Sequence, residues 1–468
     1  MGAGARHGKA VRVLLALAAL GPASAALSQS SAAPAEPPLR DLRTLVAAAE
    51  THYPALAQRE AMVRAAEARR LEARISPFFA SWRTDFGLTF APEASGTPIF
   101  TEDSQLPLGN RFRPVYSVLA EGVVPLWTFG RLEAARDAAD AGVRAAELDI
   151  ARRRAQLRYD VRRAYFGLQL ALDIEQMIGE GRGQLRRAIA VLDEALMNDE
   201  PDANPFDRYR LAAAAAEVDA RGSEAQRLRR ASEAVLRTLT GFEGIAPPLC
   251  PMEPIALEEA DLPAFLADAT TQRPEVGMLE AAEDARRAAV DNAVGTLSPD
   301  LAVVVRAGIS RAYGITDVEN PFVQDPGNRP QLAAALLMRW SLDVGGNTAR
   351  LRRARAELEG TRAQVAEATL GLRLEVELAY EAYQDASRRE AAWQEARRET
   401  RRWFIASAQG YDVGATEPKD LVDALRAYFE ARFNHVEAVR AVNTAVAELE
   451  RVVGRPLLPE DGWEPPCE

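Results

Sequence analysis

The chain has 468 residues, of which 57 are Lys or Arg and 68 are Asp or Glu, giving a formal net charge of −11. This acidic balance gives no support to nucleic-acid binding, which depends on basic surfaces. After the N-terminal region, no run approaches the roughly 18 apolar residues that a transmembrane helix needs. An exported form of the chain is therefore expected to be periplasmic, secreted, or inserted in a membrane as β-strands.

The N-terminus has the pattern of a secretory signal peptide. Arg6, Lys9 and Arg12 precede an apolar run over residues 13–20, and small residues follow at 23–25. This order predicts a signal peptide over residues 1–25, and hence export. Residues 26–41 are rich in Ser, Ala and Pro, which predicts a flexible N-terminal lead.

Two very long helices are predicted, one in each half of the chain. Residues 130–197 contain no proline and are rich in Ala, Leu, Arg and Glu, and a helix of this length extends roughly 100 Å. Residues 345–386 align with residues 130–171 without a gap. The alignment indicates an internal duplication. We expect repeat 1 over 42–245, a linker over 246–261, repeat 2 over 262–456 and a C-terminal tail over 457–468.

Each repeat is expected to contain the same elements in the same order. Repeat 1 has a helix over 42–75, a strand pair over about 79–126, the long helix over 130–197 and a return helix over 206–241. Repeat 2 has a helix over 262–297, a strand pair over about 300–343, a long helix over 346–409 and a return helix over 419–454. Two shorter helices placed end to end match one long helix, which favours long antiparallel coiled coils.

The strand pairs alternate between apolar and polar residues, as strands with two different faces do. The pattern fits membrane strands of about 9–11 residues, and it also fits a soluble hairpin with a core face. The apolar side is expected to include Trp82, Phe86, Leu88, Phe90, Tyr116, Val118, Leu126, Val303, Val305, Ile309, Leu332, Leu336 and Met338.

Aromatic residues lie where the strands meet the helices. Trp82, Trp127 and Trp340 are placed as a girdle at one membrane interface would be, which shifts the choice towards membrane strands. Pro125, Gly130 and Gly345 mark the strand–helix junctions. Five charged residues are candidates for a lumen-facing surface. They are Arg83, Asp85, Glu121, Arg306 and Arg339. The alternative is a solvated face that has no effect on ion selectivity.

Four strands cannot close a barrel, and open edges are not tolerated in lipid. Two copies would supply eight strands, whose interior side chains fill, whereas three copies supply twelve and leave a passage. The expected fold class is therefore mainly helical with a membrane β-barrel portion. Each subunit contributes four strands to a trimeric 12-stranded barrel, which an α-helical tunnel continues.

Several short motifs, repeated in both halves, resemble the TolC-like outer-membrane efflux protein family. They are the prolines Pro54 and Pro274, the Ser-Pro pairs at 76–77 and 298–299, the junctions at 125–131 and 341–346, and the stretch from Tyr411 to Thr416. The resemblance covers essentially all of the chain after the signal peptide. It implies an outer-membrane exit duct for efflux or type I secretion, extending into the periplasm and forming a homotrimer in outer-membrane lipid.

The same resemblance implies a partner at the helical tips, where family members dock a periplasmic adaptor (membrane fusion) protein and through it an inner-membrane pump. It assigns this role to Val413, Gly414 and Ala415, next to Thr416. The tip of the first half differs, because it lacks Val-Gly and is acidic at Asp199 and Glu200.

Residues suited to catalysis or metal binding are sparse. His52 and His435 have no partners at metal-ligand spacing, and no nucleophile–base set or cofactor motif is visible, so we expect no enzyme, metal or cofactor. Cys250 and Cys467 follow equivalent repeat ends, and either a disulfide or two free thiols fits that placement. The alternatives to a channel are a periplasmic coiled-coil adaptor or structural envelope protein, and a secreted enzyme.

Overall fold

The computed structural model describes residues 41–79, 82–94, 108–198, 204–246, 251–257, 261–315, 327–412, 415–459 and 463. Several sequence predictions lie outside these residues. They are the signal peptide over 1–25, the lead up to residue 40, and the residues Asp199, Glu200, Cys250, Val413, Gly414 and Cys467.

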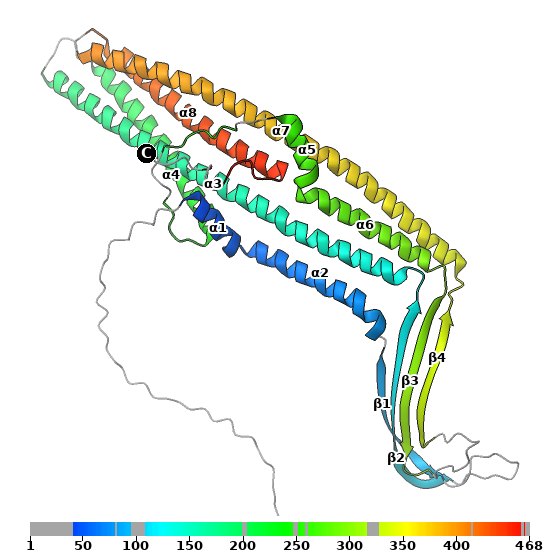
Figure 1. Ribbon diagram of the computed structural model, residues 1–468. Coiled ribbons are helices and arrows are strands. Elements are labelled where there is room, and N and C mark those ends of the chain that lie inside the picture. Colours follow the sequence, from blue (N-terminus) through cyan, green and yellow to red (C-terminus); the bar gives the residue numbers. More distant parts are fainter. Residues whose placement is uncertain are drawn as a thin grey trace, which may run out of the picture. The chain divides into compact units, whose positions relative to one another are not determined.

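Two long helices form the frame of the described chain (Figure 1). Helix α3, Arg131–Met197, has 67 residues, and helix α7, Val344–Asp412, has 69. At 1.5 Å per residue each is about 100 Å long. Each is followed by a 36-residue helix that runs back beside it, α4, Pro205–Thr240, after α3 and α8, Pro418–Val453, after α7.

Two pairs of shorter helices complete the bundle. They are α1, Leu42–His52, with α2, Pro54–Phe79, and α5, Leu262–Gln272, with α6, Pro274–Gly295. Proline begins the second helix of each pair, because its missing N–H is not needed in a first turn. The expected end of the first helix at residue 75 is wrong, since α2 continues through the Ser-Pro pair for another turn. A proline there removes one backbone hydrogen bond without ending the helix.

The strands form a single antiparallel sheet with the order β1-β2-β3-β4. The strands are β1, Arg83–Ala94, β2, Leu108–Trp127, β3, Asp300–Ala312, and β4, Arg329–Arg339. The central pairing joins β2 from the first half to β3 from the second half over twelve paired positions. Among the described residues, strands β1 and β4 are therefore the edges of the sheet, each with one unpaired side.

The hydrophobic core lies between the helices. One cluster gathers α1, α3, α4 and α8 around Tyr165, Phe166 and Leu236. A second joins α5, α7 and α8 around Phe265, Val376 and Leu449. Within the described residues, no helix combines the length and the apolar character needed to cross a membrane.

Candidate functional site

One face of the sheet carries large apolar side chains that no other described part of the chain covers. In the register, Phe86 faces Val118, and Val118 faces Ile309. On β4, Leu332 and Leu336 fall on this same face. Phe86 and Leu332 are 79% and 85% exposed. Exposed apolar surface of this extent marks a contact with lipid or protein.

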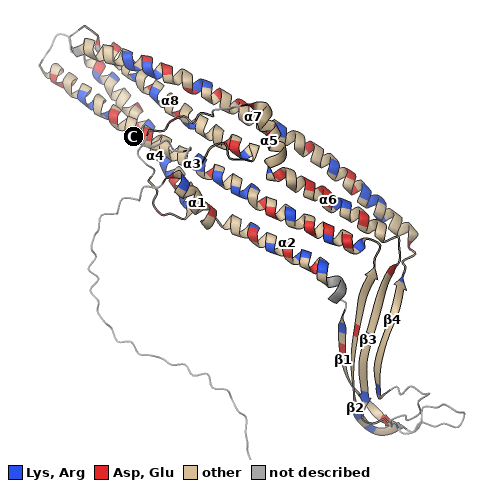
Figure 2. Ribbon diagram, in the orientation of Figure 1, with Lys and Arg blue, Asp and Glu red and all other residues tan. Residues whose placement is uncertain are grey.

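The opposite face carries all five of the charged residues chosen as lumen candidates. Arg83, Glu121 and Arg306 occupy one row across three strands. Arg306 Nε donates to Glu121 Oε2 at 2.9 Å, and Arg83 Nε donates to Asp85 Oδ1 at 3.0 Å. Arg339 faces Asp300 at the helix end of the sheet, on the same side as the row. In Figure 2 these strands show only scattered charge along a largely uncharged sheet.

The three tryptophans lie at the helix end of the sheet and are exposed. The Trp82 ring covers Gly122, where an added Cβ would lie 2.5 Å from the ring. Trp340 Nε1 donates to the Leu297 carbonyl at 3.1 Å. Trp127 pairs with Leu301 on the apolar face, and Gly122, which the Trp82 ring covers, pairs with Val305 on the same face.

A β-bulge places Trp127 on that face. Pro125 pairs with Ala302 and Trp127 with Leu301, so Leu126 is the extra residue. Because a bulge shifts the alternation by one residue, Trp127 shares the face of Leu301, where counting by two along β2 would not have placed it.

The two strand–helix junctions differ, although the sequence pairs Gly130 with Gly345. Gly130 precedes α3 in the left-handed region, with φ of 85°, and its neighbour Phe129 also has positive φ. Gly345 instead lies inside the first turn of α7, where Asp343 Oδ1 accepts from the Gly346 N–H at 2.9 Å. An aspartate side chain thus caps the N-terminus of α7, whereas a glycine in the left-handed conformation precedes α3.

The first junction is also fixed to the sheet by an ion pair that the sequence did not reveal. Arg131 Nη1 lies 2.7 Å from Asp300 Oδ2, which joins the start of α3 to the start of β3. The two residues are 169 positions apart, so no local pattern connects them.

The helical tip is described in part. Ala415 is exposed, and its N–H donates to the Gly410 carbonyl at 2.7 Å. Thr416 lies against Gly410, where an added Cβ would lie 2.1 Å from Thr416 Oγ1. At the other tip, Met197, Phe206 and Tyr209 are exposed apolar or aromatic residues. The sequence prediction emphasised acidic residues there and missed these three.

Between the bundle helices, the segment 251–257 is held to the helices by side chains. Asn443 of α8 accepts from the Ile255 N–H at 2.8 Å and donates to the Glu253 carbonyl at 2.9 Å. Tyr383 of α7 accepts from the Leu257 N–H at 3.1 Å. Asp173 of α3 accepts from the Met252 backbone, and burial raises the pKa of its carboxyl to about 6 against the opposing charge of Arg432.

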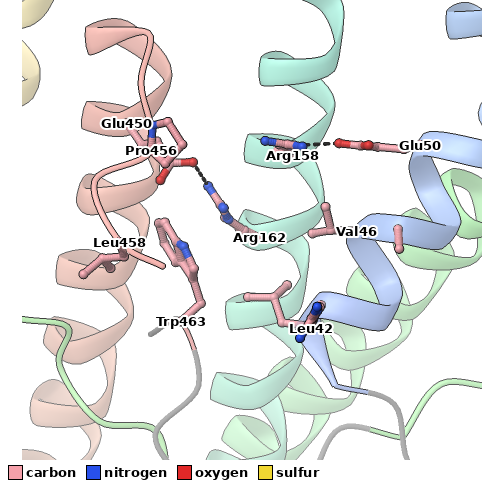
Figure 3. A pocket seen from close by; sticks show the side chains of 11 residues that line it. Leu42, Val46, Glu50, Arg158, Arg162, Glu450, Pro456, Leu458 and Trp463 are labelled. Atoms are coloured by element: carbon pink, nitrogen blue, oxygen red, sulfur yellow. Dashed lines mark hydrogen bonds and ion pairs between the residues drawn. The ribbon is translucent and has the colours of Figure 1, made fainter. Parts of the chain in front are cut away.

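A pocket of about 280 Å³ lies where α1, α3, α8 and the segment after α8 meet (Figure 3). Arg158 Nε pairs with Glu50 Oε1 at 2.6 Å, and Arg162 pairs with Glu450. Since these charges are neutralised within the chain, the pocket is a polar junction between the two halves.

His435 does not gather metal ligands around it. Its Nε2 lies 3.1 Å from Glu390 Oε1, and its Nδ1 lies 3.2 Å from Arg397 Nη1. Across the described residues, no group of three His, Cys, Asp or Glu side chains could hold a metal ion.

Comparison with solved structures shows that outer-membrane channels have the same fold as this chain. The outer-membrane channel OprN matches with a TM-score of 0.72 and 21% identity, covering 89% of this chain and 91% of that one. VceC from Vibrio cholerae matches with a TM-score of 0.69 and 18% identity, covering 89% and 97%. The open state of the MtrE channel from Neisseria gonorrhoeae matches with a TM-score of 0.70 and 18% identity, covering 89% of each chain.

Residues 265–455 match the family model described as Outer membrane efflux protein. The predicted resemblance and the predicted class of long helices with two hairpins are therefore confirmed. No curated protein matches the chain.

Proposed function

We propose that the chain is a subunit of an outer-membrane exit duct of a tripartite efflux or type I secretion system. It conducts small molecules or proteins passively out of the periplasm. The observation that carries the proposal is the sheet, which has one exposed apolar face, one face with charged rows, and two open edges. An apolar outer face and a polar inner face are what a membrane barrel needs.

The open edges favour assembly into a homotrimer. Unpaired strand edges are not tolerated in lipid, and three copies would join β4 of each subunit to β1 of the next in a twelve-stranded barrel. The helices support the same arrangement, because α7 exposes a stripe of leucines at a spacing of four residues, and α2 exposes Met62, Leu71 and Ile75. We infer that α2 of one subunit covers the α7 stripe of the next, which is formed by Leu370, Leu374 and Leu378.

The helical portion extends the duct into the periplasm and presents its tips to a partner. We infer that Ala415 and Thr416, with Val413, Gly414, Asp199 and Glu200, contribute to docking a periplasmic adaptor that connects an inner-membrane pump. The exposed Met197, Phe206 and Tyr209 support a protein contact at this end. We also infer that residues 42–245 and 262–456 are duplicated repeats, since each contains a broken helix, a hairpin, a long helix and a 36-residue helix.

The test is expression of the full chain with its N-terminal region in a Gram-negative host. We expect it in the outer-membrane fraction as a heat-modifiable trimer that forms ion channels in planar bilayers. The variant Leu374→Asp should lose the trimer, whereas Leu297→Asp, outside the stripe, should keep it. A water-soluble monomer that never enters detergent micelles would contradict the proposal and favour a periplasmic adaptor instead.

A further inference from the structure

A positively charged residue lies on the apolar face of the sheet, at the end away from the helices. Arg311 follows Val303, Val305 and Ile309 on the same face of β3 and is directly opposite Tyr116 on β2. It is exposed, and it makes no ion pair within the described part of the chain.

Tyrosines lie around this arginine. Tyr116 and Tyr313 have ring centroids 5.9 Å apart, with the ring planes tilted by 44°. Tyr313 is one of the more exposed aromatic residues of the chain. Tyrosine combines an apolar ring with a polar tip and is enriched where lipid tails meet headgroups.

The distance from Arg311 to the tryptophan girdle agrees with a position at the second boundary between lipid tails and headgroups. Trp127 pairs with Leu301, and Arg311 lies ten residues further along β3. Ten residues at roughly 3.3 Å each span about 33 Å along a strand. A tilt of about 40° reduces this to about 25 Å of height, which is the height of the apolar band of outer-membrane barrels. The two aromatic levels thus bound one membrane thickness.

The energetics of a charged side chain on a lipid face support the same placement. An arginine there costs about 2–4 kcal/mol at the midplane but about 0–1 kcal/mol near an interface. At the interface its planar guanidinium can bind a phosphate through two parallel hydrogen bonds.

We propose that Arg311, flanked by Tyr116 and Tyr313, binds the phosphate of a phosphorylated lipid headgroup in the outer leaflet. The site rests on the proposed function, since it requires the apolar face to meet lipid. It fixes the depth of the barrel in the membrane and attaches an annular lipid to the β2–β3 pair, which joins the two halves of each subunit.

The experiment uses the full-length protein purified in detergent. Its thermal unfolding is followed while diphosphorylated lipid A, the same lipid with its phosphates removed, or inorganic phosphate is added. We expect stabilisation by the phosphorylated lipid alone among the three additives. The variant Arg311→Gln should weaken the apparent lipid affinity about tenfold, as loss of a hydrogen bond to a charged group does, and Arg311→Lys should weaken it less.

The matched control is Arg113→Gln, which removes an arginine from the same end of the sheet. Arg113 lies on the opposite face and pairs with Glu93 at 2.6 Å, so its loss should leave lipid affinity unchanged. Equal stabilisation of the wild type by both lipids overturns the site without any variant, as does an Arg311→Gln protein that binds like the wild type. Stabilisation by inorganic phosphate alone would show an anion site without lipid specificity and would also overturn it.

Insertion into vesicles is measured separately by flotation. If the wild type floats with vesicles and shows no preference for the phosphorylated lipid, only the lipid site fails. If it does not float, the proposed function fails as well.

Discussion

Arg162 of α3 and Glu450 of α8 form a buried ion pair that connects the two halves of the chain. Their side chains are only 8% and 9% exposed. The Arg162 guanidinium also lies 3.7 Å from the centre of the Trp463 ring, and Glu450 Oε2 accepts from the Leu457 N–H at 3.1 Å. One carboxylate therefore holds both the opposing helix and the segment that follows α8.

Removing one member of this pair should destabilise the protein strongly. Arg162→Met leaves the Glu450 charge buried without its cation, and such a loss costs about 3–5 kcal/mol. We expect a clear fall in the thermal midpoint of the purified protein and faster proteolysis of the segment after α8. The control is Arg398→Met, because Arg398 and Glu395 form an exposed pair worth about 0–1 kcal/mol. Equal effects of the two variants would show that the buried pair is not important for stability.

His435 should make the hairpin of α7 and α8 sensitive to acid. Burial, followed by the nearby Arg397 charge, lowers the pKa of this imidazole, and the Glu390 contact opposes the shift only in part. The folded state thus favours the neutral ring, whereas the unfolded chain binds a proton near pH 6.5. Stability is lost as the pH falls below about 6.5 towards the folded pKa. The protection factors of the α7 and α8 amides, which are corrected for the pH dependence of intrinsic exchange, should be lower at pH 5.5 than at pH 7.5.

The variant His435→Gln should remove most of this difference, because the Gln amide does not titrate and can hydrogen-bond to both Glu390 and Arg397. His52→Gln provides the control, since His52 is exposed on α1. An unchanged pH difference in His435→Gln would assign the effect to other groups.

Asp173 should act with the opposite sign. Burial raises the pKa of this carboxyl to about 6, so the folded state holds its proton more tightly than the unfolded chain. Stability from this group is gained as the pH falls from about 6 to about 4 and is lost above that window. Asp173→Asn keeps an acceptor for the Met252 N–H and should stabilise the protein at pH 7.5 by about 2 kcal/mol. Denaturation at pH 7.5 and pH 5 checks this, with the exposed Asp385→Asn as control.

Period-two patterning predicted which residues share a face of the sheet, because side-chain direction in a strand depends only on parity. The five lumen candidates and the apolar positions on β1 and β4 followed from it. The bulge at Leu126 did not, since an extra residue is specified by backbone pairing between β2 and β3. Arg311 shares parity with Ile309, so the signal for an arginine on the apolar face was present in the alternation.

Contacts between residues far apart in the sequence could not be predicted from the helix and strand periodicity. Arg131 with Asp300, Arg162 with Glu450, and Asn443 with the 251–257 segment join residues more than 150 positions apart. Each is a polar residue in or next to a regular element, where helix periodicity gives no sign of its partner. Only the packing of the two halves brings these groups together.

The row formed by Arg83, Glu121 and Arg306 should influence ion flow if this face lines the lumen. Arg306→Ala removes a cation and leaves Glu121 unpaired, so we expect lower anion preference and an altered single-channel conductance in planar bilayers. Arg339→Ala should shift selectivity in the same direction, because it too removes a positive charge from this face. Glu121→Gln should shift it the opposite way, and the effects should weaken at 1 M salt, where the Debye length is about 3 Å. Arg113→Gln, at the far end of the same face, tests whether the effect depends on depth. Recordings of Arg306→Ala and Arg339→Ala that match the wild type at low salt would show that these charges do not control permeation.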